Sequence, residues 1–85
     1  MALTVVYARD ARKALVGIGA RDRERILLRV EAYAAVPDAA SHDVRTLVAQ
    51  QPGFRLRVGV WRVLFDRSET TMDIRYVLHR REAYR

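Results

Sequence analysis

Three arginines, Arg55, Arg57 and Arg62, interrupt the otherwise apolar stretch GFRLRVGVWRVLF at residues 53–65. The stretch alternates with a period of two, which is typical of strands with one buried and one open face. On adjacent antiparallel strands such side chains come within roughly 5 to 8 Å of each other, where like charges repel unless an anion lies between them. Because the guanidinium fork fits phosphate and carboxylate groups, the spacing favours an anion-binding site. An ordinary solvated sheet face is the alternative.

Histidine is the residue type that could move a proton beside such an anion, since its unperturbed pKa is about 6.5. His79 ends an apolar stretch and is followed by Arg80, which makes it the candidate acid or base; a structural hydrogen-bonding role is the alternative. His42 lies in a polar connector and is assigned no role. The sequence has no cysteine and no histidine–carboxylate cluster, so it predicts no metal site.

The overall charge also favours an anionic partner. Sixteen basic residues, fifteen of them arginine, oppose ten acidic residues and give a net charge of +6. A basic surface suits nucleic acid or an acidic protein, whereas a surface merely solvated by arginine is the alternative.

Eighty-five residues predict a single domain spanning 1–85. Without a long apolar run or a signal-peptide pattern, the expectation is a cytoplasmic protein that does not enter a membrane.

The first half of the chain predicts a strand and two helices. Residues 2–7 are β-branched and aromatic, as in a strand. Apolar residues at helical spacing follow, and Gly17 and Gly19 end that helix. Asp22 is the expected N-cap of a second helix, which Pro37 ends, so the two helices form a hairpin. Acidic residues alternate with four arginines of the second helix, which predicts a solvated face: Arg21, Arg23, Arg25 and Arg29.

The second half predicts three strands after a connector. In the connector, Val44, Leu47 and Val48 are expected to form one helical turn. Residues 54–58, a strand around Trp61 and the segment MDIRYVLH follow, with Trp61 on the buried side. The order β-α-α-β-β-β predicts an α+β fold in which the helical hairpin packs on one face of a small, mainly antiparallel sheet.

Three segments together resemble the RelE/ParE superfamily of bacterial toxins. They are A-x-K-A-L in the first helix, the stretch GFRLRVGVWRVLF, and the tail R-Y-V-L-H-R-x-x-x-Y. The resemblance runs from Tyr7 to Tyr84 and implies the RelE-like fold. RelE-like members of the superfamily cut messenger RNA on the ribosome, whereas ParE-like members inhibit DNA gyrase. The tail, with Arg80 and Tyr84, is more similar to the RelE-like group.

The resemblance implies roles for the candidate residues. Three arginines would surround the scissile phosphate: Arg55, Arg57 and Arg62. Arg80 matches the tail residue with the acid role, with Arg81 as its rival, and Tyr84 matches the aromatic residue that places the nucleotide. The family often has lysine at the positions of Arg55 and Arg57. Since arginine does not lose its proton, Arg57 is a poor general base. Charge stabilisation without such a base, His79 as the proton-transfer group, and a weak or absent nuclease activity are three open explanations.

The resemblance also implies partners. A toxin of this kind is held inactive by an acidic antitoxin in a hetero-oligomeric complex, and the three arginines form a surface that acidic side chains could neutralise. The leading hypothesis is a ribosome-dependent messenger-RNA endoribonuclease that acts on ribosome-bound RNA without metal or other cofactor. A gyrase inhibitor, with gyrase as the partner, is the first alternative. An inactive relative that only binds RNA or an antitoxin is the second.

Overall fold

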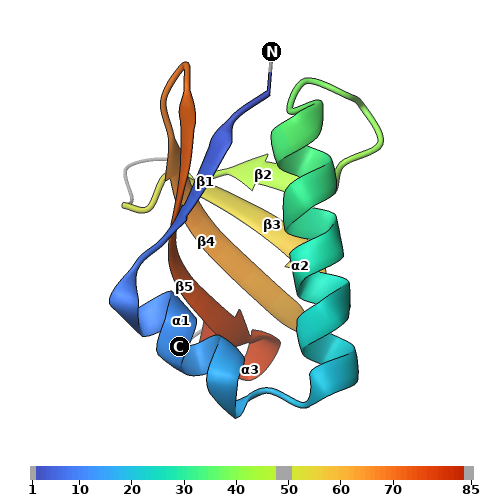
Figure 1. Cartoon of the computed structure of the whole chain (residues 1–85), viewed down its shortest axis with the longest axis vertical. Coiled ribbons are helices and arrows are strands. Elements are labelled where there is room, and N and C mark those ends of the chain that lie inside the picture. Colours follow the sequence, from blue (N-terminus) through green and yellow to red (C-terminus); the bar gives the residue numbers. More distant parts are fainter. Residues whose placement is uncertain (1, 48–50, 84–85) are drawn as a thin grey trace.

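Five strands form one mixed sheet in the order β1-β5-β4-β3-β2 (Figure 1). The computed structural model describes residues 2–47 and 51–83, without the side chain of Ala83. Its elements are β1 (Thr4–Tyr7), α1 (Arg9–Gly17), α2 (Ala20–Ala35), β2 (Val44–Thr46), β3 (Phe54–Val58), β4 (Trp61–Arg67), β5 (Thr71–His79) and α3 (Arg80–Ala83). β1 runs parallel to β5 and every other pairing is antiparallel. The predicted α+β fold is therefore confirmed.

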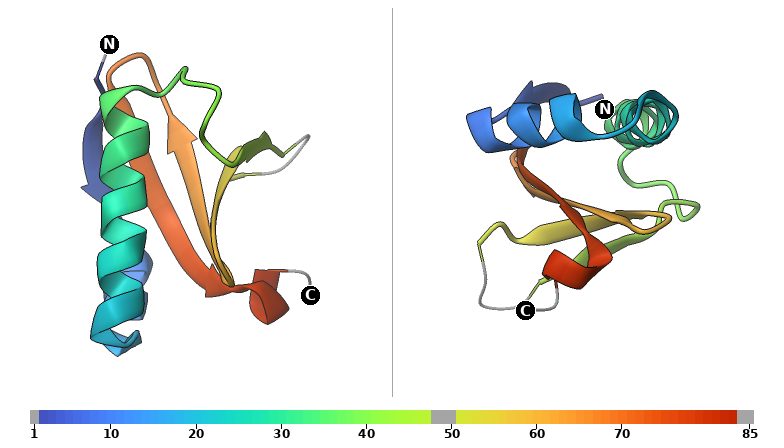
Figure 2. Two further views of the ribbon diagram at one scale, coloured as in Figure 1. Left: turned by 90° about the vertical axis from the view of Figure 1, so that its right-hand side faces the viewer. Right: turned by 90° about the horizontal axis from the view of Figure 1, so that it is seen from below.

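The two long helices lie on one side of the sheet and the short helix α3 lies on the other (Figure 2). α1 packs against β5, and α2 lies across β3 and β1. The core between these layers is fully buried, and it includes Ala11, Ile26, Val30, Leu56, Val63, Phe65, Met72 and Ile74. No helix among residues 2–47 and 51–83 is long and apolar enough to cross a membrane.

The predicted ends of the two helices are confirmed, whereas the predicted N-cap of the second helix is wrong. α1 ends at Gly17, and α2 ends at Ala35, two residues before Pro37. The residue that precedes α2 is Gly19, so the prediction of Asp22 as N-cap is wrong. Asp22 lies in the first turn, where a carboxylate interacts favourably with the helix dipole. There it accepts a hydrogen bond from Trp61 Nε1 at 3.2 Å.

The arginines of α2 form a solvated face only in part. Arg21 and Arg25 are exposed. Arg23, in contrast, is half-buried, and its Nη1 donates hydrogen bonds to two carbonyl oxygens at the end of α1, those of Leu15 and Ile18. The prediction is therefore wrong for Arg23, because the carbonyls at the C-terminus of a helix have no partner within the helix and accept a nearby cation.

The connector contains a strand where a helical turn was expected. Residues Val44–Thr46 form β2, which pairs with β3 so that Val44 lies opposite Leu56. Two of its three residues, Val44 and Thr46, are β-branched, and pairing with β3 satisfies their backbone groups. Leu47 continues the pairing, since its N–H donates to the carbonyl of Gly53 at 2.7 Å. Val48, the third residue of the expected turn, lies outside the described residues.

A β-bulge in β5 changes which side chains face the core. Leu64 pairs with Tyr76, but the next residue of β4, Phe65, pairs with Ile74. Arg75 is therefore the extra residue of the bulge. Beyond it, the residues of β5 that face the core are shifted by one position along the sequence. Ile74 points into the core before the bulge and Val77 does so after it. Tyr76 consequently lies on the opposite side of the sheet from the helices.

Candidate functional site

Two rows of side chains cross the side of the sheet that faces away from α1 and α2. Residues opposite each other on neighbouring strands point to the same side, and the strands lie about 4.8 Å apart. One row consists of Arg45, Arg55, Leu64 and Tyr76. The other consists of Arg57, Arg62 and Leu78. We call the surface formed by these two rows the arginine face. The three arginines of the sequence pattern thus share one face, as expected.

The exposure of these arginines differs from the expectation of a uniformly open face. The side chain of Arg57 is 55% exposed, and its Nε lies 3.9 Å from Asp43 Oδ2. Arg62 is only 4% exposed, and its Nη1 donates hydrogen bonds to the carbonyls of Gly59 at 2.8 Å and Trp61 at 3.0 Å. Arg55 is half-buried. Arg57 is therefore the most accessible of the three, and Arg62 holds the turn between β3 and β4.

His79 lies apart from the arginine face. It pairs with Trp61, which packs against the core, and the two rings meet edge to face with centroids 5.4 Å apart. Its Nδ1 accepts the Arg81 backbone N–H at 3.3 Å, and its own backbone N–H donates to Glu82 Oε1 at 3.1 Å. These contacts hold the start of α3. The geometry gives His79 the structural role, because the bulge turns it to the helix side of the sheet.

His42 has partners that the sequence did not indicate. Its Nε2 donates a hydrogen bond to the carbonyl of Val36 at 2.7 Å. Its ring meets Tyr33 edge to face, with centroids 5.1 Å apart. The hydroxyl of Tyr33 in turn accepts a hydrogen bond from Arg67 Nη1 at 2.8 Å. His42 therefore attaches the connector to the end of α2, and neither of these partners belongs to the arginine face.

α3 brings two further arginines to the same side of the sheet as the arginine face (Figure 2). The backbone N–H of Arg80 donates to the carbonyl of Val60 at 2.7 Å, which attaches α3 to the turn between β3 and β4. Arg80 and Arg81 are both exposed. Tyr84, the expected nucleotide-placing residue, lies outside the described residues.

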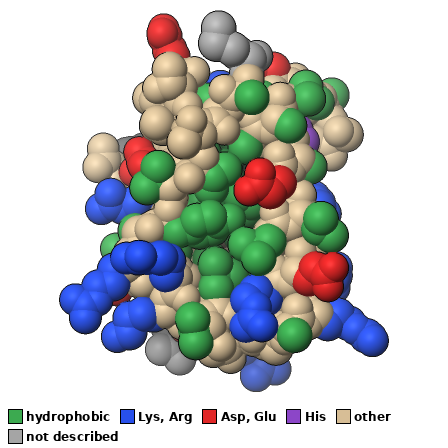
Figure 3. Space-filling view, in the orientation of Figure 1, with side chains coloured by type: hydrophobic (Ala, Val, Ile, Leu, Met, Phe, Trp, Pro, Cys, Tyr) green, Lys and Arg blue, Asp and Glu red, His purple; other side chains and the backbone are tan. Residues whose placement is uncertain are grey.

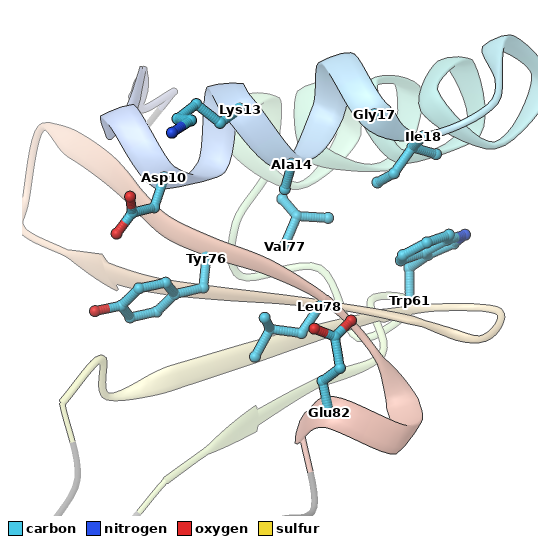
Figure 4. Close-up of a pocket in the computed structure, with 10 residues that line it drawn as sticks. All are labelled: Asp10, Lys13, Ala14, Gly17, Ile18, Trp61, Tyr76, Val77, Leu78 and Glu82. Atoms are coloured by element: carbon cyan, nitrogen blue, oxygen red, sulfur yellow. The ribbon is translucent and has the colours of Figure 1, made fainter.

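Tyr76 is the residue of this face that sequence reasoning missed. It is 39% exposed and lines two hollows at the edge of the sheet, the larger of which is shown in Figure 4. Without the bulge, alternation from Ile74 would direct Tyr76 into the core with Met72. The signal that could have found it is the apolar Val77 between Tyr76 and Leu78, which breaks the simple alternation.

The chemistry available on the arginine face is charge stabilisation. Its accessible groups are guanidinium ions, which donate hydrogen bonds to phosphate oxygens and do not act as bases. Asp66 lies beyond the first row, and its Oδ1 accepts the backbone N–H of Gly53 at 2.8 Å. Within residues 2–47 and 51–83, no three histidine or carboxylate side chains come together as a metal site. Stabilisation of a negative charge is therefore the chemistry that this face can offer.

Solved structures of other proteins have a similar fold. No family model and no curated protein matches the sequence. Solved structures are similar to it. A RelB–RelE antitoxin–toxin complex from Methanococcus jannaschii has 25% identity and a TM-score of 0.74, and the match covers 93% of this chain and 94% of that chain. A RelE–RelB complex from Pyrococcus horikoshii OT3 has 22% identity and a TM-score of 0.74, covering 94% and 97%. The chain therefore has the RelE-like fold, and its similarity to these two RelE chains supports the resemblance to the RelE/ParE superfamily.

Proposed function

We propose that this chain is the toxin of a toxin–antitoxin pair and that it cleaves messenger RNA on the ribosome. The observation that carries the proposal is the position of Arg57. It is an exposed cation on the arginine face, and Arg80 and Arg81 lie exposed on the same side of the sheet. A phosphate of an extended RNA strand could be bound between them, because each guanidinium group offers paired donors to phosphate oxygens.

The proposed reaction uses the 2′-oxygen of the RNA as nucleophile. The 2′-oxygen forms a bond to the adjacent phosphorus, the bond from phosphorus to the 5′-oxygen breaks, and negative charge builds up on the phosphate oxygens. Arg57 and Arg55 would stabilise that charge. The 2′-hydroxyl proton passes to a group other than these arginines, such as water. The leaving oxygen takes a proton from solvent, and Arg80 would stabilise the negative charge on that oxygen. Alignment and charge stabilisation then supply the rate.

The same surface supports an acidic antitoxin as the partner. The chain carries a net charge of +6, and the exposed arginines would be neutralised by carboxylates. On the other side of the molecule, hydrophobic side chains gather between β1 and α2 (Figure 3), which suits a protein partner. The two neighbouring RelE structures were solved as complexes with RelB. We place the toxin and its complex in the cytoplasm, where ribosomes and messenger RNA are found.

The test is induction of the chain in a bacterial host, followed by mapping of messenger-RNA 5′ ends. New ends within translated codons are expected for the wild type, and Arg57→Ala should reduce them at least tenfold. Arg21→Ala, which removes an exposed arginine from α2, is the matched control and should cut as the wild type does. Cleavage on intact ribosomes by purified protein that was first treated with a chelator and then freed of it tests whether the protein itself must carry a metal.

Two outcomes would contradict the proposal. Intact messages with growth arrest and DNA damage would indicate the gyrase inhibitor. Intact messages with normal growth, from a folded protein present at the wild-type level, would indicate an inactive relative that binds RNA or an antitoxin.

A further inference from the structure

The exposed ring of Tyr76 is accessible from two sides at the edge of the arginine face. On one side a hollow of about 420 Å³ runs between α1, β5 and α3, and its lining includes Lys13, Leu78 and Glu82 (Figure 4). On the other side a smaller hollow of about 100 Å³ lies beside Asp66 and Pro52. A flat ligand could therefore lie against the ring without displacing a core side chain.

The ring is directed away from the helices. In Figure 4, Val77, Ala14 and Trp61 lie on the helix side of β5, whereas Tyr76 and Leu78 lie on the other side. Val77 is buried in the core, but Tyr76 is 39% exposed. Packing against α1 therefore does not explain an aromatic residue at this position.

The register fixes the distance between this ring and a cation. Tyr76 lies opposite Leu64, and Leu64 lies opposite Arg55. Two strand spacings of about 4.8 Å separate the backbones at Tyr76 and Arg55, so they are about 10 Å apart. Leu64, half-buried between them, supplies an apolar surface. One row across three strands thus presents an aromatic ring, an aliphatic patch and a guanidinium group.

The charges at the two ends of this row indicate which end would bind the anionic part of a ligand. Two carboxylates, Asp10 and Glu82, and one cation, Lys13, line the larger hollow on the Tyr76 side. The charge of this lining is therefore negative on balance, which disfavours a phosphate there. Arg55, Arg57 and Arg45 lie at the opposite end of the two rows and favour one. A ligand with a flat neutral part and an anionic part would therefore bind with the flat part at Tyr76. Aromatic side chains beside cations are the usual platform for single-stranded RNA.

We propose that the row Tyr76–Leu64–Arg55 binds one nucleotide of single-stranded RNA, with its base stacked on Tyr76, its ribose over Leu64 and its phosphate toward Arg55. This inference rests on the proposed function and adds to it a nucleotide-positioning residue on β5, separate from the tail. It also predicts that the RNA crosses the strands, with bases toward the β5 edge and phosphates toward β3.

The test compares two short single-stranded RNAs of equal length and charge, one of them with the central base removed. Binding to the purified chain is measured by NMR titration, which detects weak complexes. Tyr76→Leu should weaken binding of the complete RNA roughly 5- to 100-fold, the range for loss of one base–aromatic stack, and leave the abasic RNA unaffected. Tyr76→Phe, which keeps the ring, should bind both RNAs as the wild type does. Arg57→Ala should weaken binding of both.

The two proposals fail in distinguishable ways. If Arg57→Ala weakens binding of both RNAs but Tyr76→Leu changes neither, or weakens both equally, the stacking role is overturned and the proposed function stands. If neither variant changes binding of either RNA, both proposals are overturned. Circular dichroism of each variant checks that it folds before its binding is compared.

Discussion

Arg57 and Arg62 lie directly opposite each other on β3 and β4, yet their guanidinium groups have different acceptors. Arg57 lies beside the carboxylate of Asp43, whereas Arg62 donates to the carbonyls of Gly59 and Trp61. The protein therefore tolerates two cations at one cross-strand position because each is directed to its own oxygen atoms. The two arginines therefore differ in role: Arg62 stabilises the turn between β3 and β4, and Arg57 is accessible to an anion from solvent.

This difference in role predicts that the two alanine variants differ in stability. Arg62→Ala leaves two turn carbonyls without their donor and a cavity at a buried position, so it should lower the free energy of unfolding by about 1.5–3 kcal/mol. Arg57→Ala removes a cation that is largely exposed and an ion pair near the surface, which should change it by less than about 1 kcal/mol. Urea unfolding measures both. Equal destabilisation would contradict the structural role of Arg62.

The backbone conformation of Gly59 predicts that alanine at this position destabilises the protein. It has a φ of +59°, and a Cβ there would lie 3.3 Å from Arg25 Nη2. Gly59→Ala should therefore lower the free energy of unfolding by about 1–2 kcal/mol. Gly17 is the matched control, since a Cβ there meets nothing within 4 Å and alanine favours the helix. Gly17→Ala should leave thermal unfolding unchanged or raise the midpoint. A stable Gly59→Ala protein would show that the turn adopts another conformation.

Tyr7 makes stability depend on alkaline pH. Burial, and secondly the negative charge of Glu31, raise the pKa of its phenol above 10.0. Its hydroxyl is buried without a hydrogen-bond partner among the described residues. The stabilisation from the neutral phenol is fully present below about pH 10, the pKa of an unfolded tyrosine, and is lost as the pH rises through the higher native pKa. The wild type should thus lose stability above pH 10 faster than Tyr7→Phe does.

Urea unfolding at pH 8 and at pH 11 measures this difference. At pH 8, Tyr7→Phe should already be more stable by roughly 1 kcal/mol, because it removes a buried donor without a partner. The advantage should grow at pH 11. Glu31→Gln should reduce that growth, since it removes the charge that contributes to the raised pKa. A pH-independent difference between wild type and Tyr7→Phe would rule out the linkage.

Arg23 is predicted to stabilise the junction between the two long helices. Its guanidinium group donates to the carbonyls of Leu15 and Ile18, each at 3.2 Å. Arg23→Ala should lower the free energy of unfolding by about 1 kcal/mol, because these carbonyls then depend on water. Hydrogen exchange should show faster opening at the end of α1. Arg21→Ala, an exposed neighbour on the same helix, should have neither effect.

The sequence predicts most of this fold because its apolar periods are clear. Alternation in residues 54–65 places Leu56, Val63 and Phe65 on one side and the arginines on the other, as the structure does. Gly17 and Pro37 mark helix ends because their backbones do not continue a helix easily. These features depend on near neighbours in the chain, so the sequence alone is sufficient for them.

The remaining features depend on residues distant in sequence. Val44 joins a strand because β3 offers unpaired backbone groups beside it, and a three-residue segment does not reveal its partner. The bulge at Arg75 allows both Ile74 and Val77 to pack in the same core. No glycine lies at this position, so the sequence does not indicate the bulge. The placements of His79 and Tyr76 on opposite sides of the sheet both depend on that one extra residue, and simple alternation along β5 does not reveal it.

The parallel pairing of β1 with β5 has a consequence for the order of folding. Thr4 lies opposite Thr71, so nearly the whole described chain separates two strands that hydrogen-bond to each other. β1 therefore gains its sheet partner only after β5 has been synthesised, and contacts this distant in sequence form slowly. A nascent chain would thus lack the complete sheet, and with it both rows of the arginine face, until β5 has been synthesised. The antitoxin proposed above would therefore meet the complete basic surface only after β5 has paired with β4.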